Sequence, residues 1–310
     1  MSLEDPILFL DGGLATELER AFGKDLSGRL WSAQCLDQDP DAIKAVHTSY
    51  FKAGANVATT ASYQASIRGF LEAGYQREQA IQLMRTSVRL ACEARDAFGR
   101  GLVALSMGCY GAVLANGAEY TGDYGDAITM DDLVEFHRER LEIFLQEPGI
   151  DFILFETIPS YLEAQAIRKL IHSSTQLRLP PVGVSFSCNS DHTISDGTLL
   201  QKCLEEFHSM PQVFAVGVNC TKPRFIPGLI QELTKEKEEK TILLYPDGGE
   251  EWDAVARHWK PDTHVPIDMF GSCMAEWACK QLKGKKIMIG GCCGTGPAHI
   301  ASVKKHVALE

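Results

Sequence analysis

The segment Phe152-Ile-Leu-Phe-Glu-Thr157 shows the pattern from which the fold can be predicted. Four consecutive apolar residues precede its glutamate. They lack the alternation of apolar and polar residues that marks a strand with one solvent-exposed face. A continuous run of this kind indicates a strand that is buried on both sides, as in a parallel sheet covered by helices. Similar runs occupy residues 7–11, 57–62, 102–108, 182–188, 213–220, 241–246 and 286–293. The chain is therefore expected to contain eight parallel strands.

Amphipathic segments lie between these runs. One has Pro40 near its start and Gly54 past its end, the usual order of residues at helix ends. Another covers residues 133–146, and Ser160-Tyr-Leu-Glu163 has the spacing of a capping box at the start of a third. Strands alternating with helices at roughly 40 residues per unit predict an α/β fold, a single-domain (β/α)8 barrel. We expect one domain over residues 1–310, with a doubly wound open sheet as the alternative.

Composition excludes several classes of protein. Hydrophobic residues make up 45% of the 310 residues, and 41 acidic residues against 30 basic ones give a net charge of −11. An acidic chain without a basic stripe is a poor partner for nucleic acid or an anionic membrane surface. The sequence has neither an apolar stretch long enough to span a membrane nor the basic and apolar regions of a signal peptide. We therefore predict a cytoplasmic protein.

The chain has ten cysteines, and most are expected to be small buried apolar residues, as is usual in a reducing compartment. Cys292 and Cys293 differ because they are adjacent and lie in a glycine-rich segment at the end of the eighth run. Cys220 ends the sixth run. In a barrel the carboxyl ends of the strands meet at one rim, where chemistry gathers. The three thiols are therefore expected to converge across the mouth of the barrel.

Three converging thiolates are typical of zinc, and three protein ligands with one open position are the pattern of a catalytic zinc site. Glycines at 290, 291 and 294 allow the backbone to turn so that both adjacent thiols point inward. The sequence therefore predicts Zn²⁺ bound by Cys220, Cys292 and Cys293. A pair of packed thiols and a vicinal disulfide remain alternatives for the adjacent cysteines.

Two carboxylates end other runs. Asp11 ends the first run, although an aspartate before two glycines is often only a turn residue. Glu156 ends the fourth run, where an exposed position is not expected and a salt bridge at the barrel mouth is the alternative. Both are candidate site residues.

These motifs resemble those of the zinc-dependent homocysteine S-methyltransferase family. The resemblance covers nearly the whole chain, from Asp11-Gly-Gly-Leu-Ala-Thr-Glu17 to Gly290-Gly-Cys-Cys-Gly-Thr295. Its most specific part is the cysteine trio, whose third member stands in Gly217-Val-Asn-Cys220. The resemblance implies a (β/α)8 barrel and places the zinc ligands of the family on the same three cysteines.

Within the family the chain looks most similar to the enzymes that use S-methylmethionine or S-adenosylmethionine. Three segments carry this likeness: Trp31-Ser-Ala33, Thr60-Ala-Ser-Tyr-Gln64 and Gly108-Cys-Tyr-Gly-Ala112. Those relatives have proline where this chain has Cys109, a departure expected to alter the stiffness of the loop more than the chemistry. The roles of Cys109 and Cys188 are not assigned.

The resemblance implies zinc-dependent transfer of a methyl group from a sulfonium donor to the thiol of L-homocysteine, which forms methionine. The residues assigned to homocysteine are Asp11, Gly12, Ser62, Glu156 and Asn219, with Asp11 and Glu156 holding its ammonium group. The residues assigned to the donor are Trp31, Tyr63 and Tyr110, whose rings would attract the sulfonium by cation–π interaction. We expect a monomer or a weak oligomer. The alternatives are the same barrel with betaine or another methyl donor, and a zinc-binding or redox-sensing thiol protein.

Overall fold

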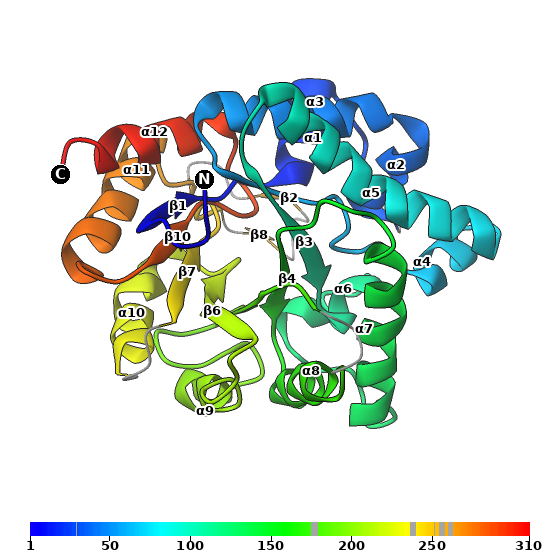
Figure 1. Cartoon of the computed structure of the whole chain (residues 1–310). Helices are drawn as coiled ribbons and strands as arrows, with labels where there is room; N and C mark the ends of the chain where they lie inside the picture. The colour runs from blue at the N-terminus through cyan, green and yellow to red at the C-terminus, as the bar shows by residue number, and fades with distance from the viewer. Residues whose placement is uncertain (29, 175–178, 236–239, 251, 254–257, 260–262) are drawn as a thin grey trace.

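Eight parallel strands form one sheet in the order β1-β10-β7-β6-β5-β4-β3-β2, which curls into a nearly closed barrel (Figure 1). The computed structural model describes residues 1–28, 30–174, 179–235, 240–250, 252–253, 258–259 and 263–310. The strands of the barrel are β1 (Ile7–Phe9), β2 (Val57–Thr59), β3 (Leu102–Gly108), β4 (Phe152–Ile158), β5 (Val182–Phe186), β6 (Val213–Asn219), β7 (Thr241–Tyr245) and β10 (Ile287–Ile289). A separate antiparallel pair consists of β8 (Trp252–Asp253) and β9 (His258–Trp259). The predicted (β/α)8 barrel is confirmed, and the doubly wound alternative is wrong.

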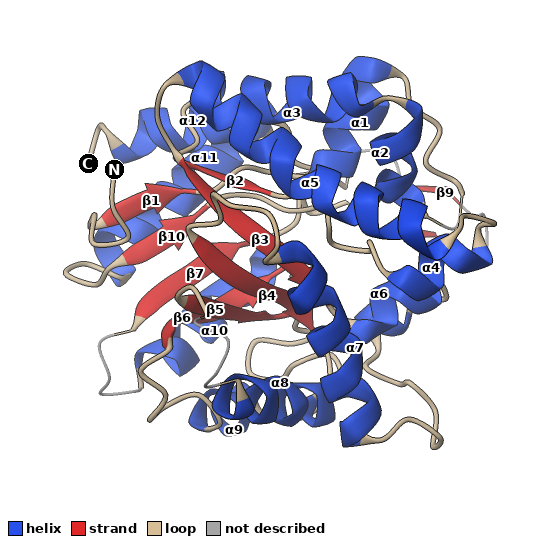
Figure 2. Ribbon diagram, turned by 45° about the vertical axis from the view of Figure 1, so that its right-hand side comes forward, coloured by secondary structure: helices blue, strands red, loops and turns tan. Residues whose placement is uncertain are grey.

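Helices alternate with these strands and cover the outside of the barrel, with α3 and α5 on one side and α8 and α9 on another (Figure 2). The helices of the first half are α1 (Leu14–Phe22), α2 (Cys35–Gln38), α3 (Pro40–Ala53), α4 (Ile67–Glu72), α5 (Arg77–Phe98), α6 (Tyr110–Leu114) and α7 (Met130–Phe144). Those of the second half are α8 (Tyr161–Ser173), α9 (Leu200–Glu205), α10 (Ile226–Thr234), α11 (Ile267–Glu276) and α12 (Pro297–Val307). Short helical turns are η1 (Trp31–Gln34), η2 (Ala118–Tyr120), η3 (Pro223–Phe225) and η4 (Trp277–Gln281). As predicted, α3 has Pro40 in its first turn and Gly54 in the left-handed conformation at its end, with φ 108°.

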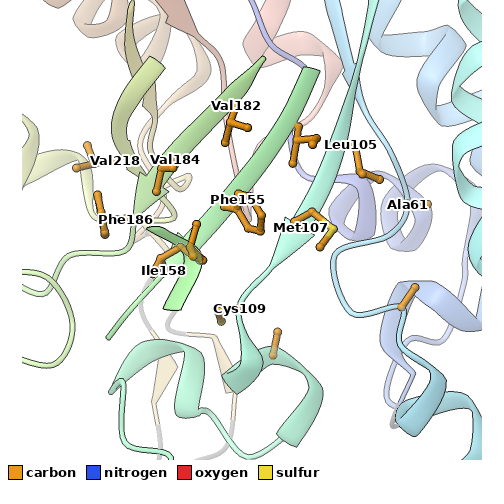
Figure 3. Packing of buried hydrophobic residues seen from close by; sticks show 14 of the residues in the cluster. Ala61, Leu105, Met107, Cys109, Phe155, Ile158, Val182, Val184, Phe186 and Val218 are labelled. Carbon is orange, nitrogen blue, oxygen red and sulfur yellow. The ribbon is translucent and has the colours of Figure 1, made fainter. Parts of the chain in front are cut away.

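The buried strands separate two apolar layers, because successive side chains of a strand point to opposite faces. Phe152 and Leu154 belong to the cluster inside the barrel. Ile153 and Phe155 belong to the larger cluster between the strands and the helices, part of which is seen in Figure 3. The same alternation places Glu156 on the inner face, at the carboxyl end of β4. A run that is apolar on both faces thus carries one carboxylate into the mouth of the barrel.

Side chains close the barrel where β1 and β2 lie next to each other. The amide of Asn56 donates to the carbonyl of Phe9 at 2.6 Å, and the amide of Phe9 donates to the side-chain oxygen of Asn56 at 3.0 Å. Nearer the carboxyl ends of the two strands, the amide and hydroxyl of Thr59 donate to the two carboxylate oxygens of Asp11, at 2.8 and 2.9 Å. Asp11 therefore takes part in closing the barrel as well as facing its mouth.

One sequence expectation about helix capping is wrong. Ser160 precedes α8, but its side chain makes no capping hydrogen bond. The carboxylate of Glu163 instead accepts from the amide of Tyr110 at 2.7 Å, contacts Nε2 of His137 at 2.8 Å and accepts from the hydroxyl of Tyr124. The spacing of a capping box is present, but the glutamate connects α8 to α7 and to the loop after β3.

Among the described residues, no helix combines the length and the apolar character that a membrane-spanning helix needs.

Candidate active site and metal centre

A cavity of about 950 Å³ opens at the carboxyl ends of the strands. This volume is typical of sites that bind small molecules. Eight of the eleven predicted site residues line it: Asp11, Gly12, Trp31, Tyr63, Glu156, Cys220, Cys292 and Cys293. The other three, Ser62, Tyr110 and Asn219, lie behind its wall.

The three cysteines predicted to converge do so. The sulfur atoms of Cys220, Cys292 and Cys293 all lie within 4.8 Å of one another, and the Sγ atoms of Cys220 and Cys293 are 3.7 Å apart. Zinc–sulfur bonds of about 2.3 Å at tetrahedral angles place two sulfurs about 3.8 Å apart. The donor atoms and their spacing therefore fit a tetrahedrally coordinated zinc ion.

The backbone around the adjacent cysteines explains why glycines flank them. A Cβ atom on Gly290 would lie 2.6 Å from the Cβ of Leu10, and one on Gly291 would lie 2.2 Å from the hydroxyl oxygen of Thr295. Gly294 has a φ of +77°, in the left-handed region that glycine adopts at little cost. Gly294 is therefore needed for its dihedral angles. Gly290 and Gly291 are needed because neighbouring atoms of Leu10 and Thr295 lie too close to leave room for a side chain.

Cys220 also has an uncommon backbone conformation, with φ 47°. A non-glycine residue in this region usually marks a turn or a functional constraint. The pKa of its thiol is raised well above the usual value, first by hydrogen bonding with Cys292 and Cys293 and then by burial. Three thiolates this close repel one another, so a bound cation is what would allow all three to ionise together.

Glu156 lies on the inner face of the barrel, 8% exposed. Its carboxylate accepts from the hydroxyl of Ser106 and from the hydroxyl of Tyr245 at 3.2 Å. Burial raises the pKa of Glu156 to about 7, and the two hydroxyl donors oppose that shift. The buried carboxylate therefore has neutral hydrogen-bond donors and leaves room in the cavity for a cationic partner.

This shift gives a prediction for Glu156→Gln. In the folded protein the carboxyl of Glu156 keeps its proton up to about pH 7. In the unfolded chain it loses the proton near its usual pKa of 4.5. Ionisation of Glu156 therefore destabilises the wild type progressively as the pH rises from 4.5 to 7, by about 2–3 kcal/mol in total. Urea unfolding is measured without homocysteine. Between pH 4.5 and pH 8, the free energy of unfolding of the variant should increase by that amount relative to the wild type. A difference that does not change with pH would contradict the raised pKa.

Asp11 is buried, with 3% of its surface exposed. Burial raises the pKa of Asp11 to about 8, the two hydrogen bonds from Thr59 lower it, and the charge of Glu156 raises it further. Two carboxylates that repel each other at one end of the cavity form a strong site for a cation. Gly12 follows Asp11, and a Cβ there would lie 2.8 Å from the hydroxyl oxygen of Thr295, so the wall at this point consists of backbone.

Asn219 does not line the cavity but connects two strand ends behind it. Its side-chain oxygen accepts from the amide of Thr157 at 2.8 Å and from the hydroxyl of Ser185 at 2.7 Å. Its side-chain nitrogen donates to the hydroxyl of Thr157 at 2.7 Å and lies 3.9 Å from the sulfur of Cys292. Thr157 has φ 59°, an uncommon value for a β-branched residue. Asn219 therefore holds a strained residue in place next to the thiol cluster.

Asn219→Ala should lower the free energy of unfolding by about 2–4 kcal/mol, because it leaves the buried amide and hydroxyl of Thr157 without their partner. Chemical denaturation measures the change. Asn116→Ala is the matched control, since Asn116 is exposed and accepts a single bond from Ala118. The control should change stability by less than about 0.5 kcal/mol. An equal effect of the two substitutions would contradict the structural role of Asn219.

Ser62 and Tyr110 lie away from the cavity. The hydroxyl of Ser62 is fully buried and donates to the carbonyl of Ser106 at 2.6 Å. The hydroxyl of Tyr110 accepts from Arg68 at 3.1 Å, and its ring packs against Tyr124. Their predicted substrate contacts are untested and would need these bonds to rearrange. The thiols not assigned from sequence, Cys109 and Cys188, are buried and are not among the described residues that line the cavity.

Tyr245 and Ser106 are functional candidates that the sequence did not single out. Tyr245 is the last residue of β7 and lines the cavity beside Glu156. Its hydroxyl contacts that of Ser185 at 2.6 Å, which extends the polar network to Asn219. Strand-end position, the signal that identified Glu156, would also have identified Tyr245. Ser106 lies inside β3, where a polar residue within an apolar run was the available signal.

Acidic residues dominate the charge of the cavity. Its described lining contains five carboxylates and one cationic side chain: Asp11, Glu19, Glu119, Glu156, Glu250 and Arg20. Arg20 is already paired with Glu250 at 2.8 Å. A cavity of this kind favours ligands with a net positive charge.

Comparisons with known proteins agree with this arrangement. A family model described as homocysteine S-methyltransferase matches residues 8–307. Homocysteine S-methyltransferase 2 from Zea mays is 44% identical over 96% of this chain and 89% of its own length. Selenocysteine Se-methyltransferase from Brassica oleracea var. italica is 41% identical over 96% of this chain and 88% of its own length.

A solved structure shows the same fold. The metallated form of the homocysteine methyltransferase MmuM from Escherichia coli superposes with a TM-score of 0.81 at 35% identity, over 99% of this chain and 97% of that chain. The predicted family is therefore confirmed by sequence and by structure. This chain belongs to the homocysteine S-methyltransferase family of enzymes.

Proposed function

We propose that this enzyme transfers a methyl group from a sulfonium donor, S-methylmethionine or S-adenosylmethionine, to the thiol of L-homocysteine. One observation carries the proposal: three thiols suited to zinc face the same cavity as two buried carboxylates. The thiols provide a place for the sulfur of an amino acid, and the carboxylates provide a place for its ammonium group. Family membership and relatives named for methyl transfer to homocysteine support the same acceptor.

Cys220, Cys292 and Cys293 would hold the zinc ion, which when bound would keep the sulfur of homocysteine as a nucleophilic thiolate at neutral pH. A free alkyl thiol has a pKa of about 8.5 and is mostly protonated there. The thiol proton leaves to solvent, so the residues around the sulfur do not have to supply a strong base. Asp11 and Glu156 would bind the ammonium group and thereby fix the direction of the acceptor.

The reaction exchanges one carbon–sulfur bond for another. The bond between the methyl carbon and the sulfonium sulfur breaks, its electron pair stays on the donor, and a neutral thioether leaves. The new bond forms between the methyl carbon and the sulfur of homocysteine, which gives methionine. Because the leaving group is neutral, no acid is needed to protonate it, and in-line positioning of the two sulfurs is the main requirement.

The wall of the cavity suits a cationic donor. Trp31 and Tyr63 line it with their rings 6.3 Å apart at 69°, edge to face. Aromatic faces attract sulfonium and ammonium groups, and the surplus of carboxylates in the lining adds to that attraction. S-methylmethionine and S-adenosylmethionine each carry a net positive charge, whereas betaine is a neutral zwitterion. The charge of the lining therefore favours the sulfonium donors over betaine.

A donor panel tests the proposal. Purified zinc-loaded enzyme is supplied with homocysteine and, in turn, S-methylmethionine, S-adenosylmethionine or betaine, and methionine is measured. We expect methionine with at least one sulfonium and little with betaine. Methionine from betaine alone would replace the proposed donor. Zinc release on oxidation without methionine from any donor would favour the redox-sensing alternative instead.

The compartment is part of the same proposal. All ten cysteines carry free thiols, and the sulfur atoms of Cys220 and Cys293 lie 3.7 Å apart without a disulfide bond. Thiols of this kind persist in reducing compartments. This supports a cytoplasmic location.

A further inference from the structure

Arg140 on α7 is fully buried and is the largest of the fully buried side chains. Its guanidinium donates to four main-chain carbonyl oxygens: Ala65 at 3.0 Å, Gly108 at 2.7 Å, Ser62 at 3.0 Å and Tyr63 at 2.9 Å. Buried arginines usually pair with carboxylates, whose geometry matches the guanidinium fork. Here the guanidinium binds main-chain carbonyl oxygens instead, so the side chain is suited to fixing the backbone conformation of the segments it contacts.

The four carbonyls belong to two segments that lie beyond the pairing between β2 and β3, although Gly108 still pairs with Glu156 of β4. The ladder between β2 and β3 joins residues 57–59 to residues 102–104. Beyond it, residues 62–65 run into the loop before α4, while Gly108 ends β3. Buried carbonyls without partners are costly, and the two segments can no longer satisfy each other. Arg140 donates to all four carbonyls, of which that of Ser62 also accepts from the amide of Ala65 at 3.1 Å, and it holds the two segments in fixed register.

Tyr63 is the member of this group that faces the cavity, and it is held from two sides. Arg140 binds its carbonyl oxygen from the direction of α7. On the side of β3, a Cβ on Gly108 would lie 2.4 Å from that carbonyl oxygen and 2.5 Å from Cδ2 of the ring. The ring therefore rests directly on the backbone of β3, with its neighbour Trp31 edge-on at 6.3 Å.

We infer that Arg140 is a positioning residue for the methyl donor: it sets the place of the Tyr63 ring against which the sulfonium is held. The inference rests on the proposed function, in which the rings of Tyr63 and Trp31 bind the donor. Attraction between a cation and an aromatic ring depends on their separation and on the face presented. Arg140 makes no hydrogen bond to Asp11 or Glu156, the two carboxylates assigned to the ammonium group of homocysteine, so its substitution should affect the donor more than the acceptor.

Arg140→Lys tests this directly, because lysine keeps the charge but replaces a planar fork with a single point on a flexible stem. We expect the KM for S-methylmethionine to rise about tenfold or more. A displacement of about 1 Å in a group that positions a substrate can lower the reaction rate by up to ~10²-fold. The KM for homocysteine and the zinc content should stay within about twofold of wild type. The matched control is Arg138→Lys, on the same helix, where the arginine is partly exposed and pairs with Glu135 at 3.5 Å. It should leave both Michaelis constants unchanged.

Gly108→Ala provides a second variant that displaces the same ring while the arginine side chain itself is kept. It should raise the KM for the donor and spare the KM for homocysteine. In either variant, equal increases of both Michaelis constants, loss of zinc or no change at all would overturn the positioning role. If wild type makes no methionine from either sulfonium, the proposed function fails and this inference fails with it.

Hydrogen exchange of the wild type decides the matter if neither variant folds. A segment held in place before substrate arrives should show slow exchange at residues 62–65, with no further slowing when S-methylmethionine binds. Fast exchange that becomes slow only with the donor would overturn the inference, because the segment would then be ordered by its ligand rather than by Arg140.

Discussion

Replacing Cys292 and Cys293 together by serine should remove zinc from the protein and abolish methionine formation. The structure places both thiols within 4.8 Å of Cys220, and a single remaining thiolate cannot hold the ion with comparable affinity. Activity should fall by at least ~100-fold, because even residues that only support metal ligands are worth 10–100-fold. Elemental analysis of the purified protein and a methionine assay measure the two effects.

A matched control separates metal binding from general loss of cysteines. Cys273 and Cys279 are partly exposed free thiols on α11 and η4, outside the thiol cluster. Cys273→Ser/Cys279→Ser should keep one zinc per chain and wild-type activity. Full zinc in the Cys292→Ser/Cys293→Ser protein would rule out these two residues as ligands.

Glu156→Gln should weaken the binding of homocysteine while leaving the zinc content normal. The carboxylate is buried at the mouth of the barrel, where its neighbours are the hydroxyls of Ser106 and Tyr245. If the ammonium of homocysteine is its cationic partner, the loss is that of a charged hydrogen bond, about 1.5–3 kcal/mol. The KM for homocysteine should therefore rise about 10- to 100-fold.

The donor and a surface glutamate provide the controls for this result. The KM for S-methylmethionine should change little in Glu156→Gln, because the donor is assigned to the aromatic rings of Trp31 and Tyr63. Glu142→Gln makes the same chemical change on an exposed position of α7 and should leave both Michaelis constants as they are. An unchanged KM for homocysteine in Glu156→Gln would refute the assigned role.

The barrel and its thiol cluster could be predicted because both depend on local patterns. Continuous apolar runs identify strands buried on two faces, and a carboxylate or cysteine that ends such a run must lie at the rim. Glu156 and Cys220 were found in this way. Most of the strands, though not β3 and β4, are shorter than their runs: β2 ends at Thr59 and β10 at Ile289, so Cys292 and Cys293 lie in the turn beyond the sheet.

The contacts that hold the site could not be predicted, because each joins segments far apart in the sequence. Asn219 fixes Thr157 through side-chain bonds across the sheet. Arg140 lies in a helix whose pattern marks it as amphipathic, yet it is fully buried against the carbonyls of the loop before α4 and of the end of β3. Glu163 has the spacing of a capping residue but bonds instead to the amide of Tyr110 at the start of α6. Such side chains satisfy buried backbone groups that exist only once the barrel has formed.

Zinc-edge X-ray absorption tests the central claim most directly, because it counts the sulfur atoms around the metal. We expect three sulfur ligands in the resting enzyme, from Cys220, Cys292 and Cys293, and four after homocysteine is added, since the substrate is proposed to bind through its own sulfur. Four sulfurs before substrate would mean a closed structural site, and three sulfurs that stay three with homocysteine bound would place the acceptor away from the metal. Either result would contradict the proposed function at its first requirement.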